Sequence, residues 1–148
     1  MRQKILLGLV FLFATVLVGS TTWAASACTG CTPGYWKQAQ HFGSWTDGYV
    51  HEYSPGDTVS AAFGCGPEEM TLLEALSAKG GQENALLRHA TAALLNTAQE
   101  YVNYPIDTAG IQSIFCTAWD DTWDYEGAKN YFAERNERFC PLGRAEAE

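Results

Sequence analysis

Basic residues are scarce in this chain of 148 amino acids, which has 9 Lys and Arg against 17 Asp and Glu and a formal net charge of -8. Two of the basic residues, Arg2 and Lys4, lie in the first few positions, and no acidic residue occurs before Asp47. Residues 28–148 therefore hold 7 basic and 17 acidic side chains, a net charge of -10. So acidic a surface repels phosphate backbones, and we expect no nucleic-acid partner.

The chain also lacks the patterns of several common protein classes. Its long apolar run, residues 5–18, is shorter than the roughly 20 apolar residues of a transmembrane helix. There is no Gly-x-Ser-x-Gly motif, no internal repeat and no long alternation of apolar and polar residues. We therefore expect no membrane span after processing, no cofactor and no enzyme, since no motif points to a reaction class.

The first 27 residues have the three parts of a secretory signal peptide. Arg2 and Lys4 form the positive region, residues 5–18 form the apolar region, and Ala25-Ser26-Ala27 has the small residues of a cleavage site. This predicts a signal peptide over 1–27, a mature domain over 28–143 and a flexible acidic tail over 144–148. Localisation is then extracellular, periplasmic or at the cell surface. Lipidation of Cys28 is an alternative, although Ala25 stands where such sites usually carry Leu.

The mature chain has five cysteines, which in an exported protein are disulfide candidates: Cys28, Cys31, Cys65, Cys116 and Cys140. A bridge from Cys31 to Cys140 would join the two ends of the domain, but several connectivities are possible. Because the number is odd, at least one thiol is free, lipidated or paired between chains. Cys28-Thr29-Gly30-Cys31 also fits a redox or a zinc motif. A redox motif would follow a strand and open a helix, and a zinc site would need a second pair of ligands, but the sequence shows neither context.

The sequence predicts a mainly α, small single-domain helical fold with a loop-rich and aromatic-rich N-terminal segment, stapled by disulfides. Thr71-Leu72-Leu73-Glu74 is a capping box that opens a short helix through Ala78. Asp107 caps a third helix, and a fourth begins at Asp121 or Thr122 and runs to about Glu137, with Phe139 turned inward.

The strongest helical pattern covers residues 83–102. One apolar stripe comprises Leu86, Ala90, Ala93, Leu94, Thr97 and Tyr101, and a second comprises Leu87, Leu95, Ala98 and Val102. The clear solvent-facing edge comprises Arg88, Asn96, Gln99 and Glu100. Two adjoining stripes predict a helix that is covered on most sides and lies at the centre of the fold.

Three spaced motifs resemble a family of secreted bacterial proteins with a GYWK-x-H-type motif. The first is CTPGYWK at residues 31–37, followed by Gln40-His41-Phe42 and Trp45. The second is LLRHA at 86–90 with AALLN at 92–96, and the third is Asn136 with CPL at 140–142. The resemblance covers residues 31–143 and implies one fold and use at the cell surface or outside the cell, without catalytic roles.

The first motif supplies our binding candidates, which are Tyr35, Trp36, Lys37, His41 and Trp45. With Tyr49 and Tyr53 the two Trp residues could form a stacking platform for sugars, to which Lys37 and Asp47 would add hydrogen bonds. The alternative is that these rings form the core of a segment that has few aliphatic residues.

Metal binding is a further possibility that the composition leaves open, although we commit to no metal site. The three histidines are His41, His51 and His89, and the first two could join Asp47 or Glu52. None has the helical i, i+4 spacing of a specific site, and His89 suits a structural position. The acids Asp120, Asp121, Asp124 and Glu126 could bind calcium or simply favour a helix N-terminus.

These observations favour a non-enzymatic exported protein that serves as a cell-surface or extracellular interaction or structural module. Its partner would be a surface polysaccharide or another extracellular protein, and disulfide-linked or non-covalent self-association is possible. The alternatives are a carbohydrate-binding domain and, further, a small metal-dependent hydrolase on His41, His51 and Asp47.

Overall fold

The computed structural model describes residues 27–45 and 51–144. Most of the expected signal peptide, the tail from residue 145, and Asp47 and Tyr49 lie outside the described residues. Within the described part the fold is mainly helical, and one isolated bridge between Thr58 and Thr71 is its β-structure. None of the helices in these two ranges has the length and apolarity that a membrane crossing requires.

The elements follow one another from a loop-rich N-terminal half to a helical C-terminal half. The first half contains α1 (Pro33–Trp36), the 3₁₀ helix η1 (Ala39–Trp45), α2 (Val59–Phe63) and α3 (Leu72–Ser77). The second contains α4 (Gln82–Ala98), α5 (Thr108–Cys116), the π-helix η2 (Thr117–Thr122), α6 (Tyr125–Asn136) and the short 3₁₀ helix η3 (Leu142–Arg144). The predicted fold class is confirmed.

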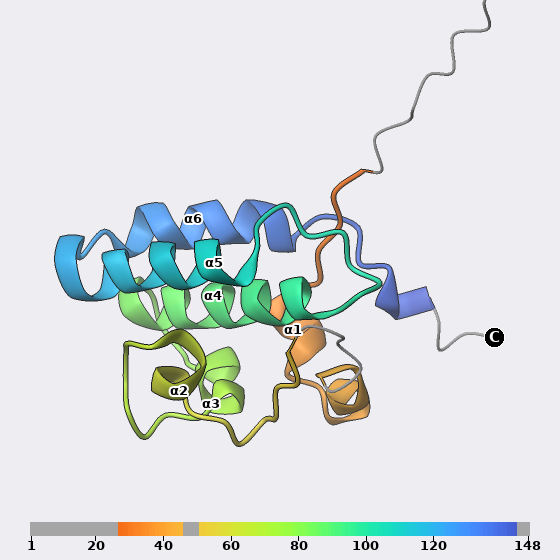
Figure 1. Ribbon diagram of the computed structural model, residues 1–148, viewed down its shortest axis with the longest axis horizontal. Helices are drawn as coiled ribbons and strands as arrows, with labels where there is room; N and C mark the ends of the chain where they lie inside the picture. Colours follow the sequence, from red (N-terminus) through yellow and green to blue (C-terminus); the bar gives the residue numbers. More distant parts are fainter. Residues whose placement is uncertain (1–26, 46–50, 145–148) are drawn as a thin grey trace, which may run out of the picture.

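Helix α4 is the centre of the molecule, as its two apolar stripes predict. It contacts α1 and α3 on one side and α5 and α6 on the other (Figure 1). Eleven of its residues are buried, and its leucines are among the largest fully buried side chains. The hydrophobic stripe residues within α4 are therefore buried, because neighbouring helices pack on both sides of it.

Short-range polar signals set the start of most helices. Thr71 accepts a hydrogen bond from the amide of Glu74, and the Glu74 carboxylate accepts one from the amide of Thr71, so the predicted capping box is present. Asp107 caps α5 by accepting from the amide of Gly110, also as predicted. These bonds satisfy amides of the first turn that have no partner inside the helix.

The C-terminal end of α4 differs from the prediction. The helix ends at Ala98, four residues before the expected boundary. Gln99 is extended and buried, and its side-chain Nε2 donates a hydrogen bond to the carbonyl of Ser44 at 3.0 Å. Tyr101, assigned to the buried stripe, is 68% exposed. Gln99 and Asn96, assigned to the solvent edge, are both buried, since each bonds to the N-terminal segment.

The start of the last helix is also later than predicted. Instead of beginning at Asp121 or Thr122, α6 begins at Tyr125 after Asp124, which accepts from the amide of Gly127. The residues before it extend α5 as the π-helix η2, and Trp123 then reverses the backbone at φ +57°. Phe139, predicted to turn inward, is 55% exposed because the helix has already ended at Asn136.

Two disulfides join segments that are distant in the sequence. Cys31 pairs with Cys140, the bridge that would join the two ends of the domain, and Cys65 pairs with Cys116. Cys28 is the free thiol among the described residues. Bridges of this kind form in oxidising compartments, which supports an environment outside the cytoplasm.

Candidate functional site

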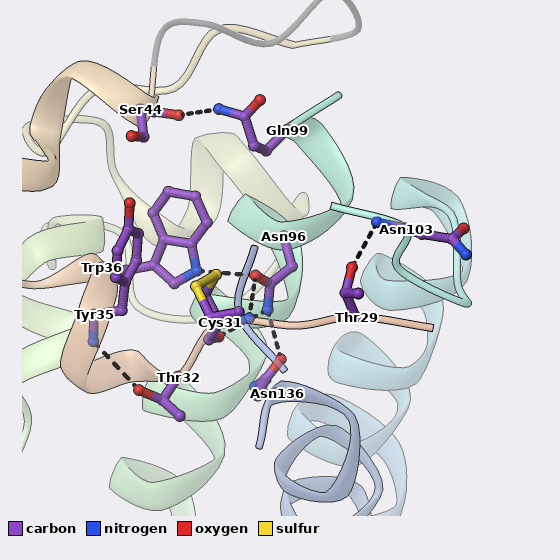
Figure 2. Close-up of a disulfide and its surroundings, with 11 residues drawn as sticks. Thr29, Cys31, Thr32, Tyr35, Trp36, Ser44, Asn96, Gln99, Asn103 and Asn136 are labelled. Carbon is purple, nitrogen blue, oxygen red and sulfur yellow. Dashed lines mark hydrogen bonds between the residues drawn. A yellow bond between two sulfur atoms is a disulfide. The ribbon is translucent and has the colours of Figure 1, made fainter. Parts of the chain in front are cut away.

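The three sequence motifs meet at the buried side chain of Asn96, on α4 (Figure 2). Its Oδ1 accepts hydrogen bonds from the amide of Cys31 at 2.8 Å and from the indole Nε1 of Trp36 at 3.1 Å. Its Nδ2 donates to the carbonyl of Cys31 at 2.9 Å and to Oδ1 of Asn136 at 3.0 Å. The first motif, the second motif and the third are thus tied together by one amide group.

Asn136, on α6, continues the network toward the surface. Its Oδ1 also accepts from the Tyr104 hydroxyl at 2.9 Å, and its Nδ2 donates to the carbonyl of His89 at 2.8 Å. Burial raises the pKa of Tyr104 well above its usual value, so the phenol stays protonated and keeps donating.

This network is complete and therefore structural. An Asn side chain offers two acceptor and two donor positions, and Asn96 uses all four on its neighbours. A buried amide without partners would cost a few kcal/mol, whereas a satisfied one specifies which segments pack together. Its role is to hold the residue 28–32 segment and the Cys31–Cys140 disulfide against α4 and α6.

The indoles of the first motif are inside the protein and not on a binding face. Trp36 is 0% exposed and Trp45 is 1% exposed, and the Nε1 of Trp45 donates to the carbonyl of Trp36 at 3.1 Å. Tyr53 is buried too, and burial raises its pKa. The sugar-stacking platform of Trp36 and Trp45 is therefore wrong, because neither ring can reach a ligand; these rings form the core, which was the alternative.

The other candidates of this segment lie at its rim. Tyr35 is half-buried and stacks on the buried ring of His41, with ring centroids 3.9 Å apart, while Lys37 is exposed. The structure thus brings Tyr35, Trp36 and His41 together but leaves Lys37 apart from them in solvent.

The histidines do not gather around a common point. His51 is exposed and lies near Tyr53, and His89 lies between α4 and α6, with Arg88, Lys129 and Glu137 as charged neighbours. In the two described ranges no group of three or more His, Cys, Asp or Glu side chains could hold a metal ion. Asp47, the acid of the hydrolase hypothesis, lies outside these ranges.

Two of the four acids near the start of α6 have structural partners. Asp124 caps the helix, and Glu126 lies 2.8 Å from the ammonium of Lys129, whose hydrogen bond and charge lower the pKa of Glu126. Asp120 and Asp121, in η2, are exposed. Helix capping thus accounts for Asp124, and an ion pair within α6 accounts for Glu126, so both acids have structural partners.

A groove lies between α5 and α6, outside the three motifs. It has a volume of about 530 Å³. Its first wall consists of Ser113, Ile114, Thr117 and Ala118, and its second of Asp124, Gly127, Ala128 and Tyr131. The lining is mostly apolar and formed by small side chains, which is why two helices that both pack on α4 leave space between them.

One exposed aromatic residue, Trp123, is adjacent in sequence to the lining of this groove. Trp123 directly precedes the lining residue Asp124 and is 69% exposed. Its ring centroid lies 6.1 Å from that of Tyr125, which lies 5.9 Å from Trp119, which stacks on the buried Phe115. A row of rings therefore runs from the core to the surface and ends at Trp123.

Sequence reasoning does not identify the groove or the exposed ring next to it in the sequence. Neither Tyr131, which lines the groove, nor Trp123 is among the sequence candidates, although Trp123 stands among acids where the sequence predicts the start of a helix. A large apolar side chain in so polar a stretch is the signal that could have indicated an exposed ring.

Comparison of the chain with protein-family models, with curated proteins and with solved structures gives no match. The resemblance to the secreted GYWK-x-H-type family therefore stays a prediction.

Proposed function

We propose that this chain is an exported, non-enzymatic interaction module that binds its partner at the end of the molecule formed by Trp123 and the α5–α6 groove. The observation that carries this proposal is that the two Trp and the two Asn side chains of the motifs are buried, whereas another aromatic residue is exposed. Those of the three motifs bond to one another inside the fold, whereas Trp123 is 69% exposed and directly precedes Asp124, which lines an apolar groove. Aromatic side chains of this kind dominate the energetics of many interfaces.

Export is supported by the signal-peptide pattern of residues 1–27 and by the two disulfides. Mass spectrometry of the native protein tests it in one measurement. We expect a chain cleaved after Ala27 that carries two bridges and one modifiable thiol at Cys28. An intact precursor in the cytosol with five reactive thiols would contradict export.

The interaction role is tested by binding of the purified mature protein to envelope fragments of the producing cells. Trp123→Asn should reduce binding about tenfold, because an interface Trp is often a hot spot and Asn tolerates the positive φ at this position. Tyr101→Asn is the matched control, since Tyr101 is exposed to the same degree at the other end of α4. Equal binding by both variants would contradict a role for Trp123.

A carbohydrate-binding domain is the second candidate, now on a different ring. An exposed Trp beside carboxylates is an arrangement that can stack on a sugar and accept hydrogen bonds from its hydroxyls. A glycan array probed with the wild type and with Trp123→Asn tests this candidate; specific signals that Trp123→Asn abolishes would favour it over a protein partner.

A further inference from the structure

The α5–α6 groove is flanked by negative charge where it adjoins η2. Asp124 lines the groove, and Asp120 and Asp121 are exposed on η2, the element that also contributes the lining residues Thr117 and Ala118. A ligand that enters the groove from the η2 side therefore meets several carboxylates.

Two basic side chains of α6, Lys129 and Arg135, already contact other groups. The ammonium of Lys129 lies 2.8 Å from the Glu126 carboxylate, and the guanidinium of Arg135 lies 3.5 Å above the Tyr131 ring. Arg135 also donates to the carbonyl of Tyr131 at 2.7 Å. These cations therefore lie on the α6 side and at the Tyr131 end, and the end at Trp123 keeps its negative charge.

We propose that the groove receives a segment of a partner protein in which Lys or Arg side chains flank apolar ones. This inference rests on the proposed function and names its partner by chemistry. The apolar side chains would fill the space beside Ile114 and Ala118, while the cations would meet the η2 carboxylates and the face of the Trp123 indole.

Charge complementarity selects this occupant over two others. A second copy of the mature chain, residues 28–148, carries the same net charge of -10, so its own acids would oppose the approach. A neutral polysaccharide would stack on Trp123, and its hydroxyls would donate to the carboxylates, but it has neither apolar side chains to fill the groove nor cations to balance the negative charge.

The test uses three synthetic peptides about 14 residues long, which is about four helical turns. The first combines Leu and Lys in a helical pattern, the second replaces Lys by Glu, and the third replaces Leu by Ser. Binding to the oxidised mature protein is measured by calorimetry at low and at high salt. We expect the Leu–Lys peptide alone to bind well, and high salt to weaken its binding because the carboxylates are exposed.

Variants then locate the site on the protein. Trp123→Asn should weaken binding of the Leu–Lys peptide about tenfold, and Asp120→Asn combined with Asp121→Asn about fivefold. The control with the same loss of charge combines Glu52→Gln with Glu100→Gln, both exposed residues; Glu100 lies beyond the other end of the 17-residue helix α4. That control should change the affinity less than twofold.

Three results would overturn the inference. The first is equal affinity of the Trp123→Asn variant and the wild type for the Leu–Lys peptide, and the second is an equal effect of the two charge variants. The third is absence of binding of the Leu–Lys peptide. This result would overturn the inference equally if the glycan array showed that Trp123 binds a sugar or if sedimentation showed that it lies in a dimer interface. If envelope binding still depends on Trp123 in that third case, the interaction module stands and only its basic partner is wrong. A Trp123→Gly variant, also suited to the positive φ, replaces Trp123→Asn should the latter not fold.

Discussion

Asn96 on α4 donates a hydrogen bond from Nδ2 to Oδ1 of Asn136 on α6, with an N–O distance of 3.0 Å, and both side chains are 0% exposed. This bond links the two longest helices at the level of the Cys31–Cys140 bridge, because Asn96 also bonds to both backbone groups of Cys31. The polar link lies inside an otherwise apolar interface, where its loss is costly.

Replacing Asn96 by Ala should lower the free energy of unfolding by about 3 kcal/mol or more. The change leaves the amide and carbonyl of Cys31 and the indole N–H of Trp36 without their buried partner, and each such group costs about 1–3 kcal/mol. Urea unfolding of the oxidised protein measures the loss. Asn130→Ala, at an exposed position of α6, is the control and should cost less than about 1 kcal/mol. Similar losses for the two variants would contradict a central role for Asn96.

Gly30→Ala should also destabilise the fold, by about 2 kcal/mol. A Cβ at this position would collide with the backbone carbonyl of Arg135, and backbone at the end of α6 cannot move aside as a flexible side chain can. The amide of Gly30 donates to the carbonyl of Phe139, so the two segments are held close together. Thermal unfolding followed by circular dichroism measures the effect. Gly143→Ala, whose added methyl would meet open space, should leave the melting temperature nearly unchanged.

Removal of each disulfide in turn should reveal the effect of loop length. Cys31 and Cys140 are 109 residues apart and Cys65 and Cys116 are 51 apart, so in the chain-entropy model the first bridge stabilises by about 0.7 kcal/mol more. Paired Cys→Ala variants, compared by urea unfolding, test the order. A larger loss for the Cys65–Cys116 pair would show that packing around the bridge outweighs the entropy of the unfolded chain.

Acidification should destabilise the protein through His89. Burial, with a smaller contribution from Arg88, lowers its pKa, and Nδ1 has no hydrogen-bond partner in the structure. Since the folded state disfavours the charged ring, the stability is complete above the unfolded pKa of about 6.5 and falls as the pH drops through it toward the folded value. The neighbouring Glu137 opposes the shift and Lys129 supports it.

The comparison of the wild type with His89→Gln isolates this titration. We expect the midpoint of urea unfolding to fall between pH 7 and pH 5 in the wild type, with a smaller fall in the variant, whose side chain takes up no proton. Parallel pH profiles would assign the acid sensitivity to other groups.

Local signals predicted the helices well, whereas burial of polar and aromatic groups required the tertiary partners. The capping box at Thr71 and the cap at Asp107 depend on residues three positions apart, so the sequence contains all that they need. Asn96 was placed in solvent because an Asn on a helix usually lies there; its partners are up to 65 residues away. The early end of α4 has the same cause, since Gln99 bonds to Ser44 across 55 residues.

The candidate site was the least predictable part. Trp36 and Trp45 were considered for binding because of their motif, but they are buried, whereas Trp123 is exposed through a π-helix and a positive φ that no local pattern indicated. Such irregular backbone depends on how α5 and α6 are placed on α4, and π-helical turns are frequent at functional positions.

The Cys31–Cys140 bridge has a mechanical consequence for any force applied to the chain on either side of it. With the two Cα atoms 4.6 Å apart, a pulling force on the flanking segments is transmitted across the sulfur–sulfur bond. The residues between positions 31 and 140 then bear no tension, so such a force would extend the flanking segments and leave the folded part, with its α5–α6 groove, unchanged.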